Sequence, residues 1–322
     1  MKLRGIVSGF LCWVFCNAIL AQETSPLPPA AAGSIVAKIA DDVAAVEGVI
    51  SNQWVMDWLK TAKGLAAIQP TKVSLNGKEV SVDESLYYMR YGSPLAYARA
   101  LDLAITAGFE ATPNSRVFDF GYGSIGHLRM LALSGIHSVG VDVAPLLKLM
   151  YAEASGKLGT GSVHVLDGPF PRDFNLVEKV GFDYDMVISK NVLKRGYIHP
   201  QREVSNPRLL IDLGVSDLQF LEHMAKILKP QGLFVIYNFC PAKATNDQAY
   251  IPWADGESPF TKQDFISAGF EVLHFDVVDH AEARRLGQAL GWDTQGGMKL
   301  DTDLFAWYTI ARKRRDTEVA KP

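Results

Sequence analysis

The pattern of apolar positions divides the first third of the chain into helical stretches and one hairpin. Between residues 34 and 68 apolar side chains recur every three or four positions, which is helical spacing. Apolar and polar residues then alternate on both sides of Asn76-Gly77, a dipeptide that favours a two-residue hairpin turn. Helical spacing returns over residues 93–107. We therefore expect residues 34–110 to form an N-terminal cap of helices and one hairpin.

After Pro113 the pattern changes to short apolar runs separated by helical stretches. The first five runs alternate with helices, and such alternation implies a parallel sheet covered by helices on both faces. The last two runs lack this rhythm. The fold class is therefore α/β, with a main domain over residues 111–315 and a tail over 316–322. The predicted strands are residues 116–120, 138–143, 162–166, 184–189, 233–239, 271–278 and 304–312.

The first 21 residues have the layout of a secretory signal peptide. Lys2 and Arg4 precede an apolar run over residues 6–20, and Ala21 stands before a polar stretch. We expect cleavage after Ala21 and export of the rest of the chain, which would make the protein periplasmic or secreted. Because Ile19 stands where a small residue is preferred, an uncleaved membrane anchor over residues 6–20 is the alternative. Residues 22–33, rich in Pro and Ala, are expected to form a linker.

Composition and charge narrow the class of protein. The chain has 322 residues, of which 48% are hydrophobic, and this is enough apolar side chain for a large core. A formal charge of −3 provides no field that would attract nucleic acid, so a small molecule is the expected partner. Of the three cysteines, Cys12 and Cys16 fall in the export segment, and Cys240 would remain alone.

A glycine-rich turn over residues 116–126 is the most informative motif in the chain. Gly121, Gly123 and Gly126 follow a predicted strand and precede a helix, which suits a nucleotide-like ligand held close to the backbone. Asp142 ends the next strand, 21 residues after Gly121, at the spacing of a carboxylate that accepts ribose hydroxyls. Both features also occur in proteins that bind nicotinamide dinucleotides.

Two further features favour a different cofactor. Asp119 lies inside the strand, two residues before the first glycine, where dinucleotide-binding folds usually keep an aliphatic residue. A negative charge at that position suits a ligand with a cationic end. The chain also ends in a pair of strands rather than in a second βαβαβ half.

These motifs resemble, in order and spacing, those of the class I S-adenosylmethionine-dependent methyltransferases, over roughly residues 110–313. The resemblance implies a Rossmann-like seven-stranded, mostly parallel sheet with an antiparallel last strand, and a transferase that uses S-adenosyl-L-methionine. The motifs that carry it are residues 116–126, Val139-Gly140-Val141-Asp142, Val165-Leu166-Asp167, Asp183-Tyr184-Asp185-Met186-Val187-Ile188-Ser189 and Leu228-Lys229-Pro230-Gln231-Gly232-Leu233-Phe234.

The resemblance also implies roles for individual residues. Asp119 and the turn from Gly121 to Gly123 would line the methionine end of the cofactor, and Asp142 would hold the ribose. Asp167 would reach the adenine amino group, and the residues from Ser189 to Asn191 would border the methyl-transfer pocket. From the cap, Arg90 is a candidate partner for the cofactor carboxylate, because guanidinium binds carboxylates in a bidentate way.

The loops after the fourth and fifth strands of the main domain carry the candidates for the acceptor side. Lys194 and Arg195 could bind an anionic small-molecule acceptor, while Tyr197 and His199 are the candidates for a catalytic role, His199 as a base. Trp253 belongs to an aromatic segment that could form a lid. No set of residues has metal-ligand spacing.

Two alternative functions stay open at this point. One is an NAD(P)-dependent oxidoreductase, because the third glycine of the turn is Gly126, as in the dinucleotide-binding spacing, rather than residue 125. A non-catalytic exported binding protein that retains the methyltransferase fold is the other, since S-adenosylmethionine is made in the cytosol.

Overall fold

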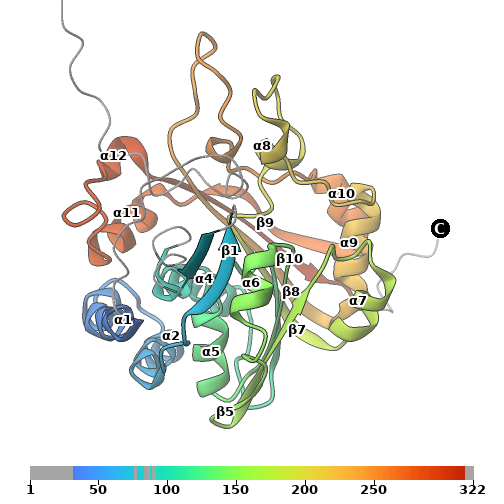
Figure 1. Ribbon diagram of the computed structural model, residues 1–322. Helices are drawn as coiled ribbons and strands as arrows, with labels where there is room; N and C mark the ends of the chain where they lie inside the picture. Colours follow the sequence, from blue (N-terminus) through green and yellow to red (C-terminus); the bar gives the residue numbers. More distant parts are fainter. Residues whose placement is uncertain (1–31, 76–77, 83, 85–87, 89–91, 316–322) are drawn as a thin grey trace, which may run out of the picture.

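The computed structural model describes residues 32–75, 78–82, 84, 88 and 92–315. Its centre is an eight-stranded sheet, and a separate two-stranded hairpin lies near the N-terminal helices (Figure 1). None of the described helices combines the length and the apolar character that crossing a membrane requires. The strands of the hairpin are β1 (Thr71–Leu75) and β2 (Lys78–Val82), and those of the large sheet are β3 (Arg116–Phe120), β4 (His137–Asp142), β5 (Gly156–Leu158), β6 (Gly161–Asp167), β7 (Tyr184–Lys190), β8 (Leu228–Cys240), β9 (Phe270–Val278) and β10 (Phe305–Lys313).

The order of the strands in the large sheet is β5-β6-β4-β3-β7-β8-β10-β9. Strands β6, β4, β3, β7 and β8 pair in parallel, while β10 is antiparallel to both of its neighbours, β8 and β9. All seven predicted strands are present, and the last one is the antiparallel strand that was expected. The short β5, antiparallel to β6 at the edge of the sheet, is an addition that the apolar pattern did not indicate.

The helices cover both faces of the sheet. One face is covered by α1 (Ala32–Glu47), α2 (Gln53–Lys60), α4 (Ala98–Thr106), α5 (Gly126–Leu133), α6 (Pro145–Met150) and α11 (His280–Ala289). The other is covered by α7 (Phe174–Val180), α9 (Asp217–Ile227) and α10 (Lys262–Ser267). The remaining helical segments are short: η1 (Thr61–Gly64), η2 (Pro94–Tyr97), α8 (Arg195–Ile198), η3 (Pro207–Leu209), η4 (Pro252–Ala254) and α12 (Leu300–Asp303).

The N-terminal helices belong to the covering layer of one sheet face. Buried side chains of α1, α2 and α4 share one hydrophobic cluster with Val117 of β3 and Ile188 of β7. Phe118, also of β3, belongs instead to the cluster on the opposite face. Because side chains alternate along a strand, Asp119 points to the same face as Val117. The N-terminal region can therefore contact Asp119 directly.

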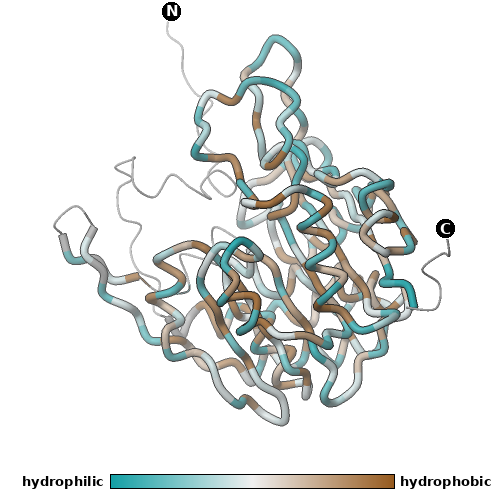
Figure 2. The backbone as a smooth tube through the Cα atoms, turned by 90° about the vertical axis from the view of Figure 1, so that its right-hand side faces the viewer, coloured by the Kyte–Doolittle hydropathy of each residue, from teal (hydrophilic) through white to brown (hydrophobic). Residues whose placement is uncertain are grey.

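Two long loops project beyond the sheet at the carboxyl ends of its parallel strands (Figure 1). One follows β7 and contains α8, and the other follows β8 and leads to η4. Arg202 of the first loop donates hydrogen bonds to backbone carbonyls of the second, those of Ala244, Thr245, Asn246 and Gln248. Figure 2 shows hydrophobic residues concentrated in the central strands and hydrophilic residues along much of these loops.

Candidate functional site

The glycine turn after β3 adopts a backbone that strongly favours glycine. Gly121 and Gly123 have positive φ angles of 80° and 57°. The amide of Gly121 donates to the carbonyl of Val141 at 2.9 Å, which fixes the turn against β4. A Cβ atom on Gly121 would lie 2.4 Å from Cγ2 of Val192, so the side chain of Val192 occupies the space that this glycine leaves.

Asp142 ends β4 and closes the turn from the other side. Its Oδ2 accepts a hydrogen bond from the amide of Gly123 at 3.0 Å, and its Oδ1 accepts from the amides of Val143 and Ala144 at 2.7 and 3.0 Å. Burial raises the pKa of this carboxyl, and the three amides act in the opposite direction. A carboxylate can accept about four hydrogen bonds, so Asp142 is held in place with capacity for one more donor.

Asp167 ends the neighbouring strand β6 and stands directly opposite Asp142 in the strand register. Its Oδ2 accepts from Nζ of Lys148, a residue of α6, at 2.9 Å. The side chain of Lys148 is 64% exposed, and an ion pair of this kind contributes little to stability. Asp142 and Asp167 therefore form an accessible acidic pair on adjacent strands.

Asp119 lies in a different environment, fully buried between the sheet and the helices of one face. Its Oδ2 accepts from Nε2 of His127 at 2.6 Å and from Oη of Tyr97 at 3.1 Å. The rings of Tyr97 and His127 are stacked, with centroids 3.6 Å apart. Burial lowers the pKa of His127 and raises that of Tyr97, so both side chains are neutral donors to the carboxylate at neutral pH. The other oxygen, Oδ1, is buried without a hydrogen-bond partner.

A lysine that lies within the predicted segment from Ser189 to Asn191, but to which the sequence analysis gave no role of its own, completes this buried cluster. Lys190 ends β7 and is 6% exposed. Its Nζ lies 4.8 Å from the centroid of the Tyr97 ring and 5.7 Å from that of Phe239. Burial lowers the pKa of Lys190 to about 8, an effect that Asp119 opposes and Lys194 reinforces. The sequence feature that could have indicated it is the position of this lysine, directly after the predicted strand over residues 184–189.

Ser189 and Asn191, predicted to border a methyl-transfer pocket, connect β7 to its neighbours. The Ser189 hydroxyl is buried and donates to the carbonyl of Phe120 at 3.0 Å. Asn191 has a positive φ of 67°, and its side-chain oxygen accepts from the amide of Phe239 at 2.7 Å. Its own amide donates to Oδ1 of Asn238 at 3.1 Å. These bonds fix the edge of the sheet next to Lys190.

The two basic candidates for the acceptor side are already engaged. The buried Nζ of Lys194 donates to the carbonyls of Phe239 and Trp253 at 2.5 and 3.2 Å. Arg195 makes a bidentate ion pair with Asp255 at 2.8 and 2.9 Å and also contacts Glu257. Both residues therefore fasten the loop after β7 to the loop after β8.

The other candidates of these loops lie at varied depths. His199 is exposed, and its Nε2 lies 2.7 Å from a carboxylate oxygen of Asp217, the first residue of α9. Tyr197 is buried beneath Nζ of Lys194, which lies 5.7 Å from its ring centroid. Trp253 is partly buried, and its Nε1 has no hydrogen-bond partner. Arg90 falls outside the described residues.

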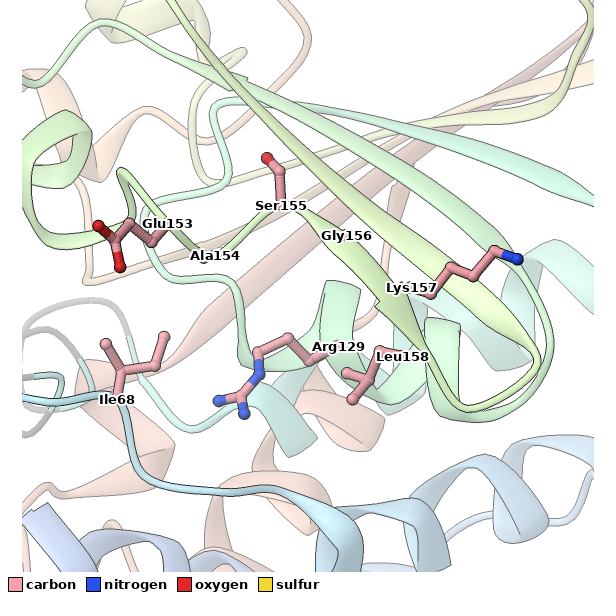
Figure 3. A pocket seen from close by; sticks show the side chains of 8 residues that line it. All are labelled: Ile68, Arg129, Glu153, Ala154, Ser155, Gly156, Lys157 and Leu158. Atoms are coloured by element: carbon pink, nitrogen blue, oxygen red, sulfur yellow. The ribbon is translucent and has the colours of Figure 1, made fainter.

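Two cavities bordered by described residues lie away from this edge of the sheet. One, of about 300 Å³, is bordered by Ile68, Arg129 and the segment from Glu153 to Leu158 (Figure 3). The guanidinium of Arg129 points toward Ile68, while Lys157 points away from it (Figure 3). The other, of about 430 Å³, lies between α11 and the segment leading to α12. Neither is lined by a predicted site residue, and in the described part of the chain no three His, Cys, Asp or Glu residues group as metal ligands.

Comparison with known proteins gives similarity to solved structures only. No family model matches the chain, and no curated protein matches its sequence. The solved structures include a putative sarcosine dimethylglycine methyltransferase from Galdieria sulphuraria, at 14% identity and TM-score 0.43, covering 70% of this chain and 87% of that one. An S-adenosylmethionine-dependent methyltransferase from Mesorhizobium loti matches at 15% identity and TM-score 0.40, covering 68% and 98%.

The similar structures also include the [4+2]-cyclase SpnF, at 14% identity and TM-score 0.39, covering 90% of this chain and 98% of that one. Methyltransferases and a cyclase thus stand together among these structures. Likeness of this degree assigns no activity, and the function of this chain has to be argued from its own residues.

Proposed function

We propose that this protein binds S-adenosylmethionine along the carboxyl ends of β6, β4 and β3 and transfers its methyl group to a small-molecule acceptor. The observation that carries the proposal is the order of acids along this edge. Asp167, Asp142 and Asp119 stand on three adjacent parallel strands, and the glycine turn lies between the last two. Ligands of open α/β sheets bind at the carboxyl ends of the strands.

The residues present fit the proposed cofactor. Asp142 has capacity for one more donor and would accept a ribose hydroxyl, and Asp167 would accept from the adenine amino group after Lys148 moves aside. Asp119 keeps one carboxylate oxygen without a partner, which suits a cationic ligand group. When bound, S-adenosylmethionine supplies an electrophilic methyl group on a sulfonium. The chain then has to align the acceptor with that methyl group and exclude water.

The end of the chain supports this cofactor over a nicotinamide dinucleotide. Strands β7, β8 and β9, with α9 and α10 between them, form a second βαβαβ half that the sequence analysis did not expect, and β10 runs antiparallel between β8 and β9. A dinucleotide normally spans the crevice between two such halves. Both halves are present in this chain, so the feature that favours S-adenosylmethionine is the antiparallel β10 inserted into the second half, which the classic dinucleotide-binding strand order lacks.

A second candidate, binding without catalysis, is favoured by the packing near β7. Val192 fills the space over Gly121, and Lys194 and Arg195 are engaged in contacts within the protein. If this candidate is right, the protein will bind S-adenosylmethionine but form no S-adenosylhomocysteine with a panel of small amines, phenols and carboxylates. Product formed with any of them supports the transferase.

Calorimetric titration with S-adenosylmethionine, S-adenosylhomocysteine and NAD tests the cofactor. We expect both sulfur ligands to bind and NAD to fail, with affinity for the sulfur ligands reduced at least tenfold in Asp142→Ala. Binding of NAD alone would support the oxidoreductase. No binding of either sulfur ligand would overturn the proposal.

We also propose that the protein is exported, on the basis of residues 1–21, which lie outside the described residues. N-terminal sequencing of the native protein tests this. A native protein that starts at Gln22 supports a cleaved signal peptide. If it starts at Met1, fractionation of the cells distinguishes a membrane-anchored protein from one that is not exported.

A further inference from the structure

The β3–β7 side of the site contains one carboxylate oxygen and one ammonium, of opposite charge, for which the described residues provide no hydrogen-bond partner. Oδ1 of Asp119 is buried and accepts no hydrogen bond. The ammonium of Lys190 lies over two aromatic rings, and we find no hydrogen bond from it to any residue that the structure describes. Burying a charged group without such partners costs free energy unless a ligand supplies them.

The two groups share one face of the sheet and one neighbour. Asp119 stands opposite Ile188 in the parallel register, and Lys190 follows Ile188 by two positions, so all three side chains point to the same face. Tyr97 connects them, because its hydroxyl bonds to Asp119 and its ring lies 4.8 Å from Nζ of Lys190.

The other basic residues at the end of β7 have partners within the protein. Lys194 donates to two backbone carbonyls, and Arg195 pairs with Asp255 and Glu257. Among these three cations, Lys190 is the one whose hydrogen-bond donors find no acceptor in the described part of the chain. It is therefore the cation best placed to meet a ligand anion.

A carboxylate and an ammonium that lie close together can bind a ligand group that carries both a positive and a negative charge. We propose that Asp119 and Lys190 together bind the α-amino-acid end of the cofactor, Asp119 its ammonium and Lys190 its carboxylate. This inference rests on the proposed function, and Arg90, the partner that the sequence suggested for the carboxylate, lies outside the described residues. Each contact would be a charge-assisted hydrogen bond, stronger than one between neutral groups.

The assignment also fixes the direction of the ligand. The adenosine end lies over Asp167 and Asp142 on β6 and β4, and the amino-acid end reaches across β3 to β7. The carboxylate of the ligand thus compensates the charge of Lys190 when Asp119 pairs with the ammonium of the ligand.

Calorimetry with two ligands separates this inference from the proposed function. S-adenosylhomocysteine has the amino-acid end, and methylthioadenosine lacks it but keeps the adenosine and the thioether. In Lys190→Met we expect affinity for S-adenosylhomocysteine to fall about 30-fold, which corresponds to about 2 kcal/mol, and affinity for methylthioadenosine to change less than threefold. Lys229→Met, at the opposite end of β8, is the matched control and should alter neither.

Wild-type protein alone provides a test that does not depend on how a variant folds. We expect the amine analogue of S-adenosylhomocysteine that lacks only the carboxylate to bind at least tenfold more weakly than S-adenosylhomocysteine itself. Equal affinities, or equal losses of both ligands in Lys190→Met, would overturn the role of Lys190 while leaving the cofactor intact. If the wild type binds no adenosine ligand at all, the proposed function fails first.

Discussion

Asp142 and Asp119 stand at the same edge of the sheet on neighbouring strands, yet their surroundings differ. Asp142 is partly exposed and accepts hydrogen bonds from three backbone amides. Asp119 is fully buried and accepts from two side chains, Tyr97 and His127. The backbone of the turn thus holds the first acid, whereas packing between the sheet and the N-terminal region holds the second.

The two acidic residues belong to the same set of motifs, yet different parts of the protein hold their side chains in place. The β4–β6 side is open and needs only the local turn to form. The β3–β7 side is closed by Tyr97, a residue of η2 that lies outside the motif region. Stability and ligand binding should therefore respond differently to mutation on the two sides.

The largest contrast is expected from removing each carboxylate in turn. Asp119→Ala leaves Lys190 as a buried cation without its compensating charge, which should cost about 3–5 kcal/mol of unfolding free energy. Asp142→Ala removes hydrogen bonds at the start of α6 and should cost about 1–2 kcal/mol. Urea denaturation measures both, and equal losses would contradict the division into a closed and an open side.

The next contrast concerns two glycines with similar backbone angles. Gly121→Ala forces a Cβ into Val192 at a φ of 80° and should destabilise the protein by about 3 kcal/mol. Gly269→Ala has a φ of 93° with nothing within 4 Å of the new Cβ, and should cost about 1 kcal/mol.

The double variant Gly121→Ala, Val192→Ala sharpens this test. If the overlap with Val192 is the cause, the second substitution should recover part of the loss in thermal and urea unfolding. Additive losses would show that backbone strain alone is responsible.

The closed side should also respond to pH through Lys190. Its folded-state pKa of about 8 is below the ordinary value of 10.5, so between these values the unfolded chain binds more protons than the folded one. Stability contributed by this group therefore rises with pH, by about 2 kcal/mol between pH 7.5 and 9.5. The unfolding free energy of the wild type should rise by that amount relative to Lys190→Met.

Taking the difference in unfolding free energy between the wild type and Lys190→Met cancels the contributions of other groups that titrate in this pH range. Burial raises the pKa of Cys240 to about 12, but this thiol is present in both proteins and cancels in the difference. A difference that stays flat with pH would show that Lys190 is solvated in the folded protein.

The smallest effect is expected on the open side. Lys148 pairs with Asp167 at the surface, so Lys148→Ala should change the unfolding free energy by less than about 0.5 kcal/mol. A loss above about 1 kcal/mol in urea denaturation would show that the acidic pair on β4 and β6 also depends on a structural ion pair.

Much of the fold could be predicted from the sequence because the strands coincide with short local runs of apolar residues. The seven apolar runs all became strands, and the antiparallel place of β10 followed from the motif resemblance. The three-residue β5 could not be predicted, since it contains Gly156 and one apolar residue and has no periodicity.

The candidate site was predictable to a smaller extent, for a physical reason. The positions of Asp119, Asp142 and Asp167 depend on strand ends, which the sequence shows. The partners of Asp119 depend on which face each side chain takes and on contacts over long separations, such as those of Tyr97. Lys194 and Arg195 were expected to meet a ligand, but loop packing gives them partners in the protein, whereas Lys190 was given no role of its own.

A crystal structure of the protein with S-adenosylhomocysteine would test the central claim most directly. The account predicts the ribose hydroxyls within hydrogen-bond distance of Asp142, and the amino-acid end between Asp119 and Lys190. A ligand bound in the opposite direction, or away from the carboxyl ends of β3, β4 and β6, would contradict it.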